Sequence, residues 1–275
     1  MKVVCCLIFL LLATMLLCFQ SNLTAWAKPP TQQTRTLPNG SLGETIKLGE
    51  ELVEKTTTHM LTKAHVGNAL NCTSCHLNNG TDPKAGTFIG VATAYPAWSP
   101  REQRVITLED RVLNCFMRSC NGVRPPLGSK PSVAITAYVT WLSDGERLRM
   151  NAKQPKGPNA LTRLAVKPES ANANRGGLLY AQKCAECHGK DGGGQDENPP
   201  VWGPRSYNQG AGLAENVPLA SWLRVAMPLD DATLTDQEAL DLAAFVNSHD
   251  RPAFDLKNHL PEERRLGEYN SEPSP

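Results

Sequence analysis

The sequence has no excess of charge of either sign. Its 275 residues include 28 Lys or Arg and 27 Asp or Glu, which gives a formal net charge of +1 at pH 7. This balance offers no electrostatic basis for binding nucleic acid or an anionic membrane surface. The sequence also lacks a second long apolar run beyond its amino terminus, so we expect no stable membrane insertion of the rest of the chain.

Residues 1–27 have the pattern of a secretory signal peptide. Lys2 precedes a mostly apolar run from Val3 to Phe19, and small residues stand at Ala25 and Ala27. We predict cleavage after Ala27 and export to the periplasm. An uncleaved membrane anchor is the alternative, although the run is shorter than the ~20 residues that a helical span needs. Cleavage would leave 27 basic residues, 27 acidic residues and six of the nine cysteines.

Four of those six cysteines form two CxxCH motifs, "CTSCH" at 72–76 and "CAECH" at 184–188. In an exported chain this spacing is typical of c-type haem attachment. Two thiols bond to the haem vinyl groups, and the adjoining histidine reaches the iron. A zinc site would use four ligands at related spacings. We therefore predict two covalent haem c groups, attached through Cys72 and Cys75 and through Cys184 and Cys187, with His76 and His188 as iron ligands.

The surroundings of the two motifs are alike. A helical pattern precedes each motif, a loop rich in Gly, Asn and Pro follows it, and an amphipathic segment closes each half, from Ser132 and from Leu234. In the second closing segment Thr235 is a good N-cap, with Glu238 placed for a capping box. This layout is that of a class I cytochrome c domain. We predict a mainly α fold of two tandem class I cytochrome c domains, at residues 28–150 and 174–275, joined by a proline-containing linker at 151–173.

The second iron ligand differs between the halves. In the second half Met227 is the one methionine, and it stands in a Met-Pro pair ahead of the closing segment. Met227 is the predicted ligand there, a core methionine being the alternative, and His/Met coordination raises the haem potential. In the first half no methionine is equally well placed. Its ligand is expected between residues 115 and 120, where Cys115, Met117 and Cys120 are the candidates.

The stretch "CFMRS" at 115–119, preceded by Arg111 and Arg101, resembles the site of the dihaem thiosulfate dehydrogenases. The resemblance covers essentially the whole chain after residue 27. It implies that Cys115 is the distal ligand of an active-site haem, and that Arg101, Arg111, Arg118 and Ser119 belong to the site. It also implies oxidation of two thiosulfate ions to tetrathionate, with electrons passing through a His/Met haem to a soluble or membrane-bound cytochrome acceptor.

The residue types suit that chemistry. Thiosulfate is a dianion, and the guanidinium groups of Arg101, Arg111 and Arg118 present forked donors that match sulfonate oxygens. We also expect Arg104 and Arg124 as helpers. The alternative is that these arginines bind haem propionates or pair with Glu102, Glu109 and Asp110. A Cys115–Cys120 disulfide is disfavoured because a spacing of five on a helix points the two side chains to different faces.

Two further functions compete with this interpretation. A dihaem electron-transfer cytochrome would need no arginine cluster and would carry methionine on both haems. A haem subunit of a multienzyme sulfur-oxidising system would need an obligate partner. The sequence also leaves open the direction of the reaction, because tetrathionate reduction would use the same site.

Overall fold

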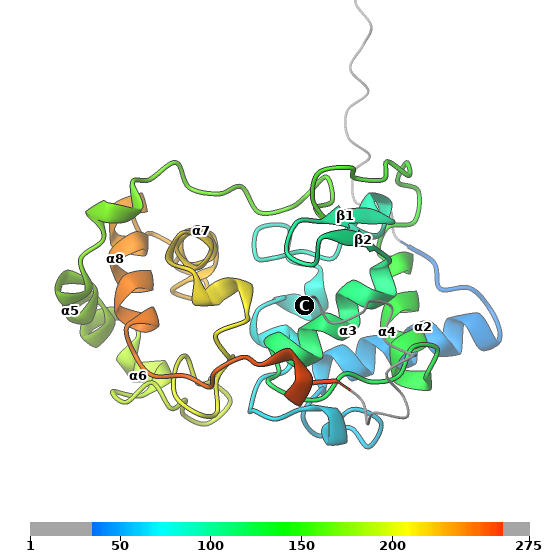
Figure 1. Cartoon of the computed structure of the whole chain (residues 1–275), viewed down its shortest axis with the longest axis horizontal. Helices are drawn as coiled ribbons and strands as arrows, with labels where there is room; N and C mark the ends of the chain where they lie inside the picture. The colour runs from blue at the N-terminus through cyan, green and yellow to red at the C-terminus, as the bar shows by residue number, and fades with distance from the viewer. Residues whose placement is uncertain (1–34, 261–275) are drawn as a thin grey trace, which may run out of the picture. The chain divides into compact units, whose positions relative to one another are not determined.

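The computed structural model describes residues 35–260, which are mainly helical with one short hairpin (Figure 1). The predicted signal peptide, residues 1–27, lies outside this range. Within residues 35–260, no helix is both long enough and apolar enough to cross a bilayer. The α-helices fall into two groups, each packed around its own apolar core.

The first group consists of α2 (Ser41–Glu54), α3 (Leu108–Arg118) and α4 (Lys130–Trp141), with α4 packed against both of the others. Strands β1 (Ala97–Ser99) and β2 (Arg104–Ile106) form an antiparallel hairpin directly before α3. Leu52, Leu113 and Tyr138 are fully buried in the core that these helices share.

The second group consists of α5 (Ala173–Lys183), α6 (Ala185–His188), α7 (Asn216–Ala226) and α8 (Asp236–Asn247). Both α5 and α7 pack against α8, as Figure 1 shows. Short 3-10 helices complete the described secondary structure: Lys63–His65, Cys72–Ser74, Asn78–Gly80, Val91–Ala94, Pro168–Ser170, Gly212–Ala214 and Leu256–Asn258.

Side-chain caps fix the starts of α3, α5 and α8. The predicted capping box of α8 is confirmed, because the Thr235 hydroxyl accepts the Glu238 N–H at 3.2 Å and the Glu238 carboxylate accepts the Thr235 N–H at 2.8 Å. An equivalent box joins Thr107 and Asp110 at the start of α3. Such caps satisfy N–H groups that have no partner inside the helix. The α3 cap sets the phase of the helix that carries Arg111 and Cys115.

The likeness of the two halves extends to their helix crossings. Gly49 of α2 lies against the Ala134 carbonyl of α4, and Gly176 of α5 lies against the Asp241 carbonyl of α8. A methyl group at either glycine would collide with that backbone. Both halves therefore use a glycine to bring the first helix onto the closing helix at close range.

Side chains join the two halves directly. The Asn68 amide donates to the Ser119 carbonyl at 2.8 Å and to the Ser206 carbonyl at 3.0 Å. Trp222 of α7 donates its indole N–H to the Cys75 carbonyl at 3.0 Å. The C-terminal segment also returns to the first half, where the His259 carbonyl accepts the Arg124 N–H at 2.9 Å. The second half thus contributes Trp222 to the surroundings of the first CxxCH motif.

The predicted linker, residues 151–173, runs between α4 and α5 and contains one short 3-10 helix. It is tied to both halves: the Asn159 amide donates to the Ile89 carbonyl at 3.0 Å, and the Leu164 N–H donates to the Ser221 hydroxyl at 3.0 Å. These bonds agree with an ordered connection rather than a freely flexible one.

Candidate active site and haem-attachment segments

Both CxxCH histidines are oriented by a carbonyl on a following loop. The Nδ1–H of His76 donates to the Gly86 carbonyl, and the Nδ1–H of His188 donates to the Pro199 carbonyl at 2.8 Å. In each ring this leaves Nε2 to bind a metal, which is the arrangement that metal-binding histidines commonly show. The two motifs therefore fit covalent haem c, with their cysteines as attachment points and their histidines as iron ligands.

The surroundings of His76 favour a neutral ring. Burial lowers the pKa of His76 to about 4. Its ring also lies against Phe88, with centroids 4.3 Å apart. A neutral imidazole is the form that binds iron, so this histidine is held ready for coordination.

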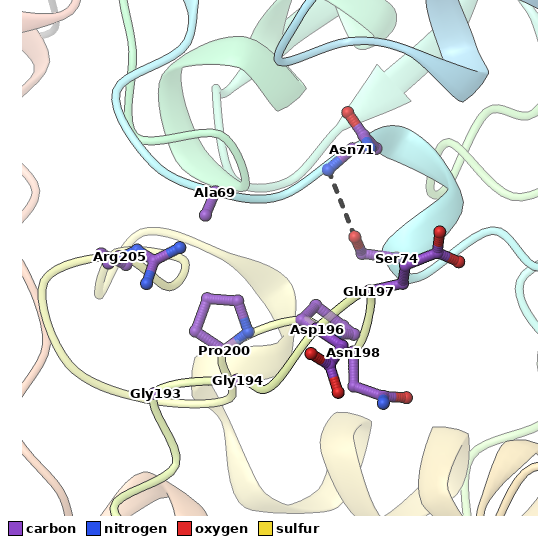
Figure 2. A pocket seen from close by; sticks show the side chains of 11 residues that line it. Ala69, Asn71, Ser74, Gly193, Gly194, Asp196, Glu197, Asn198, Pro200 and Arg205 are labelled. Atoms are coloured by element: carbon purple, nitrogen blue, oxygen red, sulfur yellow. Dashed lines mark hydrogen bonds between the residues drawn. The ribbon is translucent and has the colours of Figure 1, made fainter. Parts of the chain in front are cut away.

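A cavity of about 180 Å³ lies between the two attachment segments (Figure 2). Asn71, next to Cys72, and Ser74, next to Cys75, line one side, and residues 193–194 and 196–200 of the loop after His188 line the other. The Ser74 hydroxyl accepts the Asn71 N–H at 3.2 Å, drawn as the dashed line in Figure 2. The cavity thus adjoins both haem-attachment segments and is walled by polar groups.

The three candidates for the distal ligand in the first half have different surroundings. Cys115, on α3, is half-buried and free, so it forms no disulfide with Cys120. Met117 is fully buried and packs with Leu260 in a small apolar cluster. Cys120 is buried just beyond the end of α3. Of the three, only Cys115 is not enclosed by the protein's own packing.

Arg111 lies directly on the Cys115 thiol. Its Nη1 donates to Cys115 Sγ at 3.1 Å, across one turn of α3. Coulombic attraction to the Cys115 sulfur raises the pKa of Arg111, so this guanidinium stays charged. Tyr95 also hydrogen-bonds Arg111, and burial raises the pKa of Tyr95 to about 12, so this phenol stays neutral. Tyr95 carries no motif, and sequence reasoning did not find it.

Arg101 and Arg118 are brought together by the second half. Arg101 lies in the turn between β1 and β2, and Arg118 is the last residue of α3. Both donate to the Gly210 carbonyl, at 3.0 and 3.3 Å. The Phe254 ring covers the Arg118 guanidinium, whose Cζ lies 4.3 Å from the ring centroid. Gly210 and Phe254 carry no sequence signal and were also missed.

Ser119 caps the C-terminal end of α3, and its N–H donates to the Cys115 carbonyl at 2.8 Å. At spacings of four residues, Arg111, Cys115 and Ser119 share one face of the helix. The structure therefore places Arg111, Cys115 and Ser119 on one face of α3, and it brings Arg101 and Arg118 to the Gly210 carbonyl. Their roles in binding and catalysis remain predictions.

The expectation that Arg104 and Arg124 help in this cluster is not met. Arg124 is 1% exposed and pairs with the buried carboxylate of Asp110 at 2.6 Å. Arg104 pairs with Glu102 at 2.8 Å and with Asp110 at 3.4 Å. Both arginines are engaged in an ion-pair network that anchors α3, which is the alternative that the neighbouring acids had indicated.

Met227 directly follows α7, which ends at Ala226. It is half-buried and packs against the cluster that contains Ala85, Trp222 and Ala226. Trp222, on the same helix, contacts the first attachment segment through the Cys75 carbonyl. The helix that precedes Met227, the predicted iron ligand of the second haem, is thus hydrogen-bonded to the first CxxCH motif.

Fold and site together define a mainly α protein of two cytochrome c domains with two covalently bound haem c groups. The family described as SoxA/TsdA, cytochrome c domain, matches residues 57–148, and the family described as cytochrome C oxidase, cbb3-type, subunit III, matches residues 171–246. The chain belongs to the thiosulfate dehydrogenase family, as its similarity to curated relatives of that name shows.

The thiosulfate dehydrogenase of Allochromatium vinosum is 38% identical over 229 residues, covering 79% of this chain and 82% of the relative. That of Thiomonas intermedia is 34% identical over 230 residues, covering 82% and 71%. The solved thiosulfate dehydrogenase (TsdBA) of Marichromatium purpuratum, in its "as isolated" form, is 35% identical with a TM-score of 0.75. The match covers 90% of this chain but 54% of that one, so the chain spans about half of the solved protein.

Proposed function

We propose that this protein is an exported thiosulfate dehydrogenase that joins two thiosulfate ions through sulfur to give tetrathionate and releases two electrons. The observation that carries the proposal is the 3.1 Å contact between Arg111 Nη1 and Cys115 Sγ, on the helix that ends at Arg118. A thiol held by a guanidinium group is not needed for plain electron transfer. It suits the binding of a sulfur anion next to a redox centre.

Electrostatics explains why several arginines are needed. Two unit charges 4 Å apart interact by about 4 kcal/mol at an effective dielectric constant of 20, so two dianions repel by roughly 16 kcal/mol. One guanidinium cannot offset this repulsion. Arg101, Arg111 and Arg118 together can lower it and align the two ions for bond formation between their terminal sulfurs.

In this proposal Cys115 and His76 would hold the iron of the first haem, and Met227 and His188 would hold the iron of the second. The bound haems supply one-electron acceptors, and a thiolate ligand lowers the potential of the first relative to a thioether-ligated second. In this proposal Arg111 holds the Cys115 sulfur in place through its 3.1 Å hydrogen bond, and Trp222 keeps α7 against the first motif. A soluble or membrane-bound cytochrome would take the electrons from the second half.

The test uses the purified protein with both haems attached, thiosulfate and an artificial electron acceptor. We expect thiosulfate-dependent reduction, with one tetrathionate formed and two electrons transferred for every two thiosulfate ions consumed. Cys115→Gly, with both haems retained, is the matched control and should show nearly no turnover. Activity that appears only after addition of a partner protein would favour a subunit of a multienzyme system. Supplying tetrathionate and a reduced donor would measure the reverse reaction.

Export to the periplasm is tested on the same material. Intact mass should correspond to a chain that starts at Lys28 and carries two haems. A retained Met1 segment would refute cleavage after Ala27, and a single haem would refute attachment at both motifs.

A further inference from the structure

Three groups of the second half meet two arginines of the first half. The Gly210 carbonyl accepts hydrogen bonds from both Arg101 and Arg118, and the Phe254 ring covers Arg118. Glu215 also lies 4.0 Å from Arg101, but it is 60% exposed, and at the surface such a pair contributes little. The Gly210 carbonyl and the Phe254 ring are therefore the main contacts that the second half makes with these two arginines.

The loop that presents Gly210 is fixed to the end of α3. Asn208 is fully buried, and its amide donates to the Met117 carbonyl at 2.8 Å and to the Asn121 side chain at 2.9 Å. The same side chain accepts the Gly210 N–H at 3.0 Å. Asn208 thus connects the backbone of α3 to the residue that holds the two guanidinium groups.

Phe254 and Gly210 also fit one another. A Cβ atom at residue 210 would lie 2.5 Å from the Phe254 ring. The Gln209 N–H donates to the Pro252 carbonyl at 2.9 Å, which joins the loop to the C-terminal segment. The carbonyl and the ring therefore form one unit, the guanidinium clamp, defined here as Gly210 and Phe254.

The clamp brings two like charges to one neutral acceptor. A carbonyl only partly compensates two guanidinium groups, so an anion between them would be favoured. Stacking on an aromatic ring holds a guanidinium through its face, while its N–H donors point outward along its edge. The Phe254 ring therefore holds Arg118 through its face, while the Gly210 carbonyl takes one hydrogen bond from its Nη1.

We infer that the second cytochrome domain completes the thiosulfate site of the first, with Phe254 as a positioning residue that acts through Arg118. This inference rests on the proposed function and deepens it. It makes substrate binding, and not only electron exit, a property of both domains.

The test compares Phe254→Leu with Phe254→Tyr. Leucine keeps apolar bulk and loses the ring face, so a lost exposed cation–π contact should raise the KM for thiosulfate about 2–5-fold with kcat little changed. Tyrosine keeps the face and should restore the KM. Phe245→Leu is the matched control, because Phe245 packs on Tyr180, Trp202 and His249, away from the arginines. It should lower thermal stability and leave the KM unchanged.

A double-mutant cycle and direct binding make the test independent of turnover. If Phe254 acts through Arg118, adding Phe254→Leu to Arg118→Ala should weaken thiosulfate binding no further. Binding is measured by calorimetry on the oxidised protein with both haems and no acceptor. Equal weakening by leucine and tyrosine, or none by leucine, would overturn the inference. If the wild type binds but does not oxidise thiosulfate, the proposed function fails, and the leucine-to-tyrosine comparison of affinities still decides the role of Phe254.

Discussion

Replacing Arg124 by methionine removes a buried charge that the structure assigns to folding rather than to substrate. Its Nη2 lies 2.6 Å from Asp110 Oδ1, its Nη1 lies 2.8 Å from Asn114 Oδ1, and Asp110 is fully buried. Loss of one partner of a buried pair typically costs ~3–5 kcal/mol, because the other charge stays buried. Asp110 keeps Arg104 at 3.4 Å, so we expect the lower end, about 3 kcal/mol.

For a chain of this size, that loss corresponds to a drop in the midpoint of thermal unfolding of roughly 6–12 °C. Circular dichroism of the protein with both haems attached would measure it. Arg147→Met, at an exposed arginine, is the control and should change stability by less than about 0.5 kcal/mol. The thiosulfate KM of Arg124→Met should equal that of the wild type.

Arg118→Ala should show the opposite pattern. Loss of one charged hydrogen bond to the substrate costs about 1.5–3 kcal/mol, equivalent to a roughly 10–150-fold weaker affinity, with a small change in stability. If Arg124→Met raised the KM tenfold and left the unfolding midpoint unchanged, the division between anchoring and substrate arginines would be wrong.

Three other substitutions test the remaining assignments. Cys115→Gly should leave both haems attached but abolish the low-spin thiolate spectrum and nearly all turnover. Cys120→Ser should preserve the spectrum and the turnover. The opposite pattern would exchange the roles of the two cysteines. Met227→Gly should lower the potential of one haem in a redox titration and slow transfer to the acceptor at unchanged thiosulfate affinity; an unaltered potential would remove Met227 from the iron. Trp222→Phe leaves the Cys75 carbonyl without its indole donor and should reduce the free energy of unfolding by about 1–3 kcal/mol, measured by denaturant titration; unchanged stability would refute that estimate.

Features with a local signature could be predicted from the sequence. The CxxCH spacing led to two cytochrome c domains, and the Thr235–Glu238 spacing led to a capping box that the structure contains. The Arg111–Cys115 contact is local as well, because residues four apart on a helix face the same side. In each case the sequence separation alone determines the geometry.

Contacts between distant segments gave no such signal. Gly210 is 92 residues from Arg118, and nothing near it in the sequence marks it as an acceptor for a guanidinium. The error over Arg104 and Arg124 has a related cause. A sequence displays an arginine's charge but not its burial, and burial beside Asp110 turned two expected substrate contacts into structural ones.

Asn68 shows what this architecture implies for exchanging domains. One amide group holds the Ser119 carbonyl at the end of α3 and the Ser206 carbonyl of the other half. If the second domain completes the thiosulfate site as proposed, we expect a chimera with a foreign second domain to retain both haems and still bind thiosulfate poorly. Compatibility between two such domains would then depend on matching backbone carbonyls and ring positions at their interface as much as on matching redox potentials.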